Sequence, residues 1–277
     1  MPDAMIPNSN TIYFASNVGN SRQNQEDNAI LPNGSYLTPD VVQSISAQRR
    51  TYEKTYARSY EKGFLVAVSD GMGGHASGEV ASGQTVRYLS ENYQRIIDGA
   101  YLNKESVVDE ISRLNRSVVS LSKSDPNLRG MGATLCGVLC SNGVCYGINV
   151  GDSRLYSYQN GKFEQLSTDH TEGQRLLSLK LLTEEEYQRF PRKKNLYKYI
   201  GMNGEVVADV FKIESCEPGT VLVLCSDGLA DVISNEEISE ILSTNEPIEN
   251  KGHKLVEQAV ARNVGHGDNI TLILIEF

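Results

Sequence analysis

LVAVSDGMGGH, residues 65–75, is an apolar run that stops at the carboxylate of Asp70 and continues into three glycines and a histidine. A second apolar run, VLVLCSDGL at residues 221–229, ends in the same way at Asp227. Short apolar runs that are bounded by turn residues are typical of buried strands. Two such strands that both end in Ser-Asp-Gly indicate that something charged lies where the strands end.

The composition excludes several classes of protein. The net charge of −9 argues against nucleic acid as a partner, because phosphate backbones select basic surfaces. No apolar run approaches the ~18 residues of a membrane span, and the sequence MPDAMIPNSN shows no secretory signal. We therefore expect a cytoplasmic monomer that binds neither nucleic acid nor membranes. The five cysteines are interpreted as small buried side chains rather than zinc ligands or disulfides.

The order of the predicted elements indicates an α+β fold. Strands are predicted at 11–16, 65–69, 206–213 and 220–225, and in the last residues of the chain. Helical spacing of apolar residues predicts helices around 86–97, 107–121, 172–190, 235–243 and 247–263. Asn142-Gly143 and Asn160-Gly161 each separate two apolar runs, which is a strong hairpin signal. Hairpins with helix pairs between them favour antiparallel sheets with helices packed outside, in one domain over 1–277.

Residues 33–63 do not fit this pattern. The segment is long, polar and rich in Tyr, Arg and Lys, and its second half is predicted to be a helix. A connection of this length is uncommon unless it is functional or mobile. We interpret it as an insert that shapes substrate access or docks a partner. Deletion of 38–60 would then change activity on protein substrates more than on a small aryl phosphate.

Several acidic residues share the position of Asp70 and Asp227 at a predicted strand end. They are Asp152 in NVGDSR, Asp268 in GHGDNIT, and Glu26 and Asp27 in RQNQEDNAI. Carboxylates that crowd at one sheet edge repel each other unless a cation neutralises them. Oxygen ligands without paired His or Cys suit magnesium or manganese rather than zinc. Arg22, four residues before Glu26, is a candidate phosphate clamp, because a guanidinium holds phosphate oxygens bidentately.

Together these motifs resemble the metal-dependent type 2C family of serine/threonine protein phosphatases, in its bacterial branch. The matching segments, in the family's order, are RQNQED, DGMGGH, MGATL, VGDSRLY, STDHT, SDGL and GDNIT. They extend from about residue 11 to 277. The resemblance implies a four-layer αββα sandwich with two Mn²⁺ or Mg²⁺ ions at one edge, and a third, weaker site.

The resemblance also assigns roles to residues. It implies that Asp70 bridges both metals, that the Gly71 carbonyl binds one, and that Arg22 binds the substrate phosphate. The other implied metal ligands are Glu26, Asp227 and Asp268, with Asp152 at the third site and with Asp27 and Asn269 behind the ligands. The implied reaction is hydrolysis of a phosphate monoester by in-line attack of a metal-bridging hydroxide.

The general acid is left open. Many eukaryotic members have a histidine where this chain has Met72, so that acid is missing here. His75 and His170 are alternatives, although both are more simply interpreted as structural. A water molecule at the metals is the alternative that we favour.

Residues 171–200 match the variable flap that borders the active site in this family. Its basic stretch, Arg192, Lys193 and Lys194, either steers phosphorylated loops or is an ordinary solvated surface. The partners implied are phosphorylated proteins, with a bacterial serine/threonine kinase as functional counterpart. Two alternatives are a pseudophosphatase that binds phosphoproteins and a phosphatase of an anti-sigma-factor switch. The first predicts a lost metal ligand and the second an incomplete arginine motif, and this chain shows neither.

Overall fold

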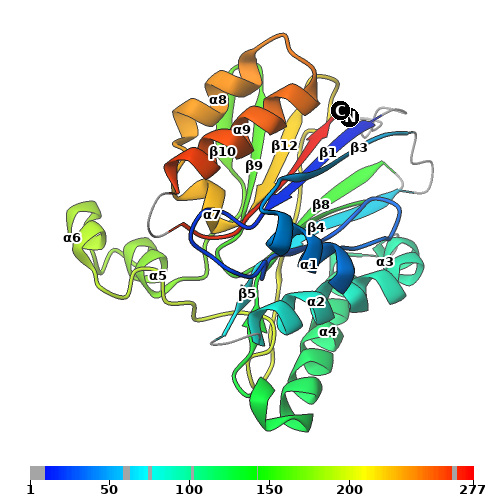
Figure 1. Ribbon diagram of the computed structural model, residues 1–277, viewed down its shortest axis with the longest axis vertical. Coiled ribbons are helices and arrows are strands. Elements are labelled where there is room, and N and C mark those ends of the chain that lie inside the picture. The colour runs from blue at the N-terminus through cyan, green and yellow to red at the C-terminus, as the bar shows by residue number, and fades with distance from the viewer. Residues whose placement is uncertain (1–9, 59–62, 74–76, 101–102, 142, 264–266) are drawn as a thin grey trace.

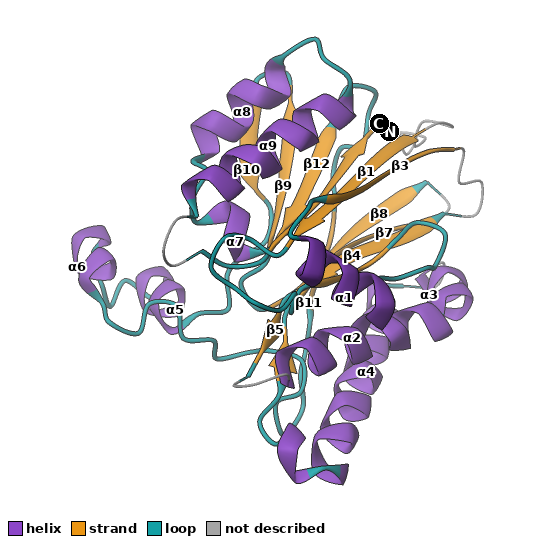
Figure 2. Cartoon of the chain, in the orientation of Figure 1, coloured by secondary structure: helices purple, strands orange, loops and turns teal. Residues whose placement is uncertain are grey.

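The computed structural model describes residues 10–58, 63–73, 77–100, 103–141, 143–263 and 267–277. Within these ranges two large antiparallel sheets lie face to face, with helices on both outer faces (Figures 1 and 2). The expected α+β class and the four-layer αββα arrangement are thus confirmed. None of the described helices is both long and apolar enough to cross a membrane.

The sheets differ in size and share no strand. The first has the order β10-β9-β12-β13-β1-β3 and comprises β1 (Asn10–Asn17), β3 (Tyr52–Arg58), β9 (Arg154–Gln159), β10 (Lys162–Gln165), β12 (Val221–Cys225) and β13 (Ile270–Glu276). The second has the order β11-β8-β7-β4-β2 and comprises β2 (Asn28–Ile30), β4 (Phe64–Ser69), β7 (Leu135–Ser141), β8 (Val144–Val150) and β11 (Asp209–Lys212). A short separate pair joins β5 (Gly71–Met72) to β6 (Gly132–Ala133).

Alternate side chains of the central strands enter different cores, because successive residues of a strand point to opposite faces. Ile12 and Phe14 lie between the two sheets, while Tyr13 and Ala15 face the outer helices. Strands β4, β7, β12 and β13 alternate in the same way. Both faces of these strands are therefore buried, which explains why the sequence shows unbroken apolar runs there.

Each outer face has its own helices. The five-stranded sheet is covered by α2 (Ser77–Glu91), α3 (Tyr93–Ala100) and α4 (Lys104–Ser124), which is followed by the 3-10 turn η1 (Pro126–Leu128). The six-stranded sheet is covered by α7 (Asp227–Ala230), α8 (Asn235–Ser243) and α9 (Ile248–Arg262). The predicted 172–190 helix is instead two short helices, α5 (Glu172–Ser178) and α6 (Glu184–Arg189), which stand away from the sandwich in Figure 1.

The prediction for residues 33–63 is wrong in its second half. The helix α1 (Pro39–Gln48) lies in the first half, and the second half forms the edge strand β3, which pairs with β1 over seven residues. Ile45 of α1 and Tyr56 of β3 pack against the core between the sheets. Deletion of 38–60 would remove a strand of the main sheet, so it does not test substrate docking cleanly.

The interpretation of all cysteines as free is also wrong. Cys140 and Cys145 face each other across the β7–β8 hairpin and form a disulfide, with Cα atoms 4.1 Å apart. The β7–β8 pairing places the two residues directly opposite each other. Cys136 and Cys225 are free and buried, as expected.

Candidate active site

The predicted carboxylates converge on one cleft at an end of the sandwich. Asp70 follows β4, Asp152 follows β8, and Asp227 follows β12 as the first residue of α7. Glu26 and Asp268 lie just before β2 and β13. Both sheets therefore contribute to the cleft, which has a volume of about 530 Å³. All five carboxylates line it, together with Arg22, Gly71, Thr134, Glu172 and Lys194.

The glycines after Asp70 allow a close approach of the backbone. A Cβ atom on Gly71 would lie 2.1 Å from the carbonyl oxygen of Gly78 in α2 and 2.8 Å from that of Glu26. The Gly71 amide donates to the Glu26 carbonyl at 3.2 Å. Gly73 has a φ of +140°, which other residues rarely adopt. The start of α2 thus packs directly on the segments that carry Asp70 and Glu26.

Hydrogen bonds to Thr134 fix the backbone of Asp70. The Asp70 amide donates to Thr134 Oγ1 at 2.9 Å, and the Thr134 amide donates to the Asp70 carbonyl at 2.8 Å. Ser69 Oγ donates to the Thr134 carbonyl at 2.8 Å. The Asp70 carboxylate is left to face the cleft.

Asp27 and Asn269, which the resemblance puts behind the ligands, do not line the cleft and instead hydrogen-bond to segments that do. Ser226 Oγ donates to the buried Asp27 carboxylate at 2.7 Å. Asn269 Oδ1 accepts from the Glu26 amide at 2.7 Å, and the Asn269 amide donates to Asp268 Oδ1 at 2.8 Å. Asn269 thus links the two chain segments that bring Glu26 and Asp268 to the cleft.

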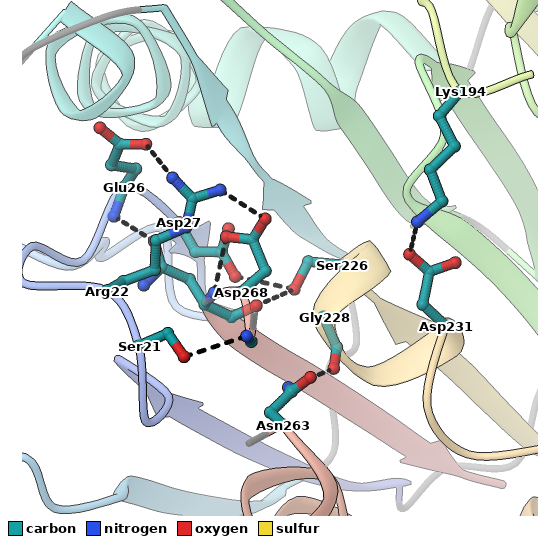
Figure 3. Close-up of polar contacts among 12 residues, drawn as sticks. Ser21, Arg22, Glu26, Asp27, Lys194, Ser226, Gly228, Asp231, Asn263 and Asp268 are labelled. Carbon is teal, nitrogen blue, oxygen red and sulfur yellow. Dashed lines mark hydrogen bonds and ion pairs between the residues drawn. The ribbon is translucent and has the colours of Figure 1, made fainter. Parts of the chain in front are cut away.

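Arg22 lies among these carboxylates (Figure 3). Its guanidinium donates to Asp268 Oδ2 at 2.7 Å and lies 4.0 Å from Glu26 Oε2. About half of its side chain is exposed, and it lines the cleft, so the guanidinium is accessible to a ligand there.

Crowding and burial raise the pKa of the carboxyl groups. Burial is the main cause for Asp70, whose pKa lies well above its usual value, and nearby Asp27, Asp227 and Asp268 raise it further. Burial and the neighbouring Asp152 likewise raise the pKa of Asp227. The pKa of Asp152 rises to about 6, chiefly through burial. Negative charge is therefore held in the cleft at a cost, which added positive charge would offset.

The donor set fits a divalent cation. Asp227 Oδ1 is buried and has no hydrogen-bond partner among the described residues. Hard carboxylate and carbonyl oxygens are the ligands that magnesium and manganese prefer. Within the described ranges, no three Asp, Glu, His or Cys side chains are already close enough together to hold a metal ion. The carboxylates surround an open cleft instead. The fit rests on donor chemistry and on backbone placement.

The position of His170 does not suit a general acid. His170 is buried and does not line the cleft; its Nδ1 accepts from the Gly151 amide at 2.9 Å and its Nε2 lies 3.0 Å from Asp209 Oδ2. With both ring nitrogens engaged, His170 holds β11 and the loop after β8 together, which corrects its candidacy as an acid. His75 lies outside the described residues.

The comparison with protein families decides the assignment. The model of the family described as protein phosphatase 2C matches residues 52–262 of this chain. The chain belongs to the protein phosphatase 2C family. It is a serine/threonine protein phosphatase, and the family to which the sequence motifs pointed is confirmed.

The similar proteins are bacterial phosphatases. The serine/threonine phosphatase stp of Listeria welshimeri is 35% identical over 216 residues, covering 76% of this chain and 84% of the relative. The protein phosphatase PhpP of Streptococcus pneumoniae is 32% identical over 232 residues, covering 82% of this chain and 93% of the relative.

Solved structures give the same result. The serine/threonine phosphatase of S. agalactiae superposes with a TM-score of 0.76 at 27% identity, covering 96% of this phosphatase and 98% of the other chain. The catalytic domain of PstP in complex with two manganese ions superposes with a TM-score of 0.69 at 28% identity, covering 96% and 98%.

One basic side chain of the 171–200 segment lines the cleft. The basic stretch is paired: Arg192 contacts Glu172 at 3.2 Å, Lys193 contacts Gln188, and Lys194 pairs with Asp231 of the α7 C-terminus. Of the three, Lys194 lines the cleft, on the side away from Arg22 (Figure 3). The three basic side chains are therefore paired rather than free, and one of them, Lys194, lies at the cleft rather than on an ordinary solvated surface.

Sequence reasoning missed the serines and the threonine that support the site. Ser69 and Ser226 are the serines of the two Ser-Asp-Gly strand ends, and each anchors its strand end to another segment. The repeated Ser-Asp-Gly was the available signal for both serines. For Thr134 the available signal was its place in the MGATL motif.

Proposed function

We propose that this phosphatase hydrolyses phosphoserine and phosphothreonine in proteins with two Mn²⁺ or Mg²⁺ ions held in the cleft. The carrying observation is that carboxylates from both sheets converge around a buried Asp227 oxygen, which has no partner in the part of the chain that the structure describes, with Arg22 beside them. The family is metal-dependent, and a similar structure contains two manganese ions.

In this proposal Asp70, Glu26 and the Gly71 carbonyl would hold one ion. Asp70, Asp227 and Asp268 would hold the other, and Asp152 would contribute to a third, weaker site. When bound, the ions supply hydroxide near neutral pH for in-line attack on phosphorus.

Arg22 contributes the charge that substrate binding needs. Its guanidinium leaves Asp268 for the equatorial oxygens of the phosphate, which gain charge as the reaction proceeds. Asp27 and Asn269 keep the ligands oriented through the Ser226 and Glu26 contacts.

The proposed substrates are phosphorylated proteins, and the proposed counterpart is a bacterial serine/threonine kinase. The substrate class is supported by the bacterial relatives named serine/threonine phosphatase stp and serine/threonine protein phosphatase PstP. A binding-only role and an anti-sigma-factor switch find no support in the comparisons. A panel of phosphopeptides separates the proposed substrates from a narrow switch protein.

The deciding experiment measures phosphate release from a phosphothreonine peptide while Mn²⁺ is titrated in and then chelated with EDTA. Wild type is compared with Asp227→Ala and with Asp98→Ala, which removes an exposed carboxylate on α3. We expect metal-dependent turnover that falls at least ~100-fold in Asp227→Ala, because losing a ligand should cost at least as much as the roughly 10–100-fold that follows loss of a partner behind the ligands. Turnover should stay unchanged in Asp98→Ala. Calorimetry of Mn²⁺ binding should show the same contrast. Full turnover in EDTA would refute the proposal.

A further inference from the structure

The loop 18–25 carries Arg22 and ends at Glu26. One side of this loop is held by the segment that precedes β13. Asn269 Nδ2 donates to the carbonyl oxygens of Val18 and Asn24, each at 3.0 Å. The Gly267 amide donates to Ser21 Oγ at 3.1 Å. These contacts tie the loop to the neighbourhood of Asp268.

The other side of the loop is held by the C-terminus of α1. Arg49 Nη2 donates to the Gly19 carbonyl at 2.9 Å, and Nη1 donates to the carbonyl of Arg22 itself at 3.2 Å. Ser46 Oγ accepts from the Gln25 amide at 2.9 Å. A single guanidinium thus spans the loop from its first turn to the residue proposed to bind phosphate.

The backbone at Arg49 is unusual for an arginine. It is the C-cap of α1 with a φ of +50°, in the left-handed region that favours glycine or asparagine. The backbone conformation does not favour arginine at this position. We therefore look to the hydrogen bonds of its side chain for the role of Arg49. Arg49 does not line the cleft, which places its effect on the loop rather than on the substrate.

We propose that Arg49 is a positioning residue, which holds the 18–25 loop so that the Arg22 guanidinium points into the cleft. The inference rests on the proposed phosphate-binding role of Arg22. It also gives the 33–63 segment a function in catalysis, because the C-terminal end of α1 holds the loop that carries Arg22 from outside the active site.

The test uses a substitution that removes the side chain without straining the backbone. Arg49→Gly suits a φ of +50°, so the melting temperature should be retained or raised. Arg49→Lys keeps the charge and one donor. Arg50→Ala is the matched control, since Arg50 is the exposed neighbour. All are assayed as full-length, Mn²⁺-loaded enzyme on a phosphothreonine peptide.

We expect Arg49→Gly to lower kcat/KM about tenfold, because a small misplacement of a positioning group is costly. Arg49→Lys should recover part of the loss, and Arg50→Ala should match wild type. The decisive readout is the double variant: in an Arg22→Ala background, Arg49→Gly should have no further effect.

The outcomes separate this inference from the proposed function. If Arg22→Ala lowers kcat/KM but Arg49→Gly does not, the positioning role is refuted and the phosphatase mechanism stands. If the two losses multiply in the double variant, Arg49 acts independently of Arg22, for example on the phosphate itself, and the inference is again refuted. If Arg22→Ala is as active as wild type, the phosphate-binding role of Arg22 fails first and takes the inference with it.

Discussion

At Gly71 the backbone that follows β4 packs against the start of α2 and against Glu26, which lies just before β2. A methyl group there would overlap the carbonyl groups of Gly78 and Glu26. Both are backbone groups, which cannot rotate away as a side chain can. We expect Gly71→Ala to lower the free energy of unfolding by about 1–3 kcal/mol, the usual cost of overpacking. Since the displaced segment carries Asp70, turnover should fall as well. Urea denaturation and phosphopeptide assays measure the two effects.

Gly99 provides the matched control for this substitution. It lies in α3, and a Cβ atom there would meet nothing within 4 Å. Gly99→Ala should therefore raise the free energy of unfolding by about 0.5–1 kcal/mol, through helix propensity alone. If the two variants had the same free energy of unfolding, the backbone around Gly71 would shift at little cost, and the predicted overpacking would be wrong.

At the scale of elements, Asp209 of β11 contacts both ends of the 171–200 segment. Its carboxylate lies 3.0 Å from His170 Nε2, just before α5, and accepts from Lys198 Nζ at 2.7 Å, near the end of the segment. The hydrogen bond from His170 is the largest cause of a pKa lowered to about 2. Because this pKa is depressed, the contact stabilises the protein above the unfolded value of about 4. The stabilisation is lost as the pH falls towards 2.

We expect Asp209→Asn to lower the free energy of unfolding by about 1 kcal/mol at pH 7, after allowance for a side chain that is half exposed. The difference from wild type should shrink between pH 4 and 2. Urea denaturation at pH 7, 5 and 3 measures it. A difference that stays constant with pH would mean that the amide fails for packing reasons and not through charge.

The elements that sequence patterns predict well are those with a strong local signal. Buried strands such as β4 and β12 appear as apolar runs, and the Asn160-Gly161 hairpin has the expected positive φ at both turn residues. The edge strand β3 lacks that signal, because one side of it is solvated and its Tyr side chains are only partly buried. Its Thr and Tyr content, which favours strands, was the remaining clue.

The sequence predicts which carboxylates gather in the cleft, but not the contacts that support them. The carboxylates could be identified because each sits at a strand end, and strand ends of a sandwich meet at one edge. The contact of Arg49 with the Arg22 loop depends on how α1 packs against loop 18–25, which no local pattern encodes. The burial of His170 depends in the same way on β11, far along the chain.

At the scale of the whole molecule, the sandwich gathers acidic groups that neither sheet alone would bring together. Asp70 and Asp152 come from the five-stranded sheet, and Asp227 and Asp268 from the six-stranded sheet. Their mutual repulsion opposes the packing of one sheet on the other. A cation in the cleft would bind all these segments at once, so its binding should stabilise the entire fold and not the cleft alone.

Mn²⁺ at about 100 times its dissociation constant should therefore add about 2.7 kcal/mol to the free energy of unfolding. For a chain of this size that corresponds to a rise in melting temperature of roughly 5–10 °C. Calorimetric melting with Mn²⁺ and then with excess EDTA measures the rise and its reversal. Asp268→Asn should lose most of it, because one ligand is weakened, while Asp98→Asn on α3 should keep it. An equal rise in Asp268→Asn would place the stabilising ion outside this cleft, and the proposed ligand set would then be wrong even if the protein remained a manganese-dependent phosphatase.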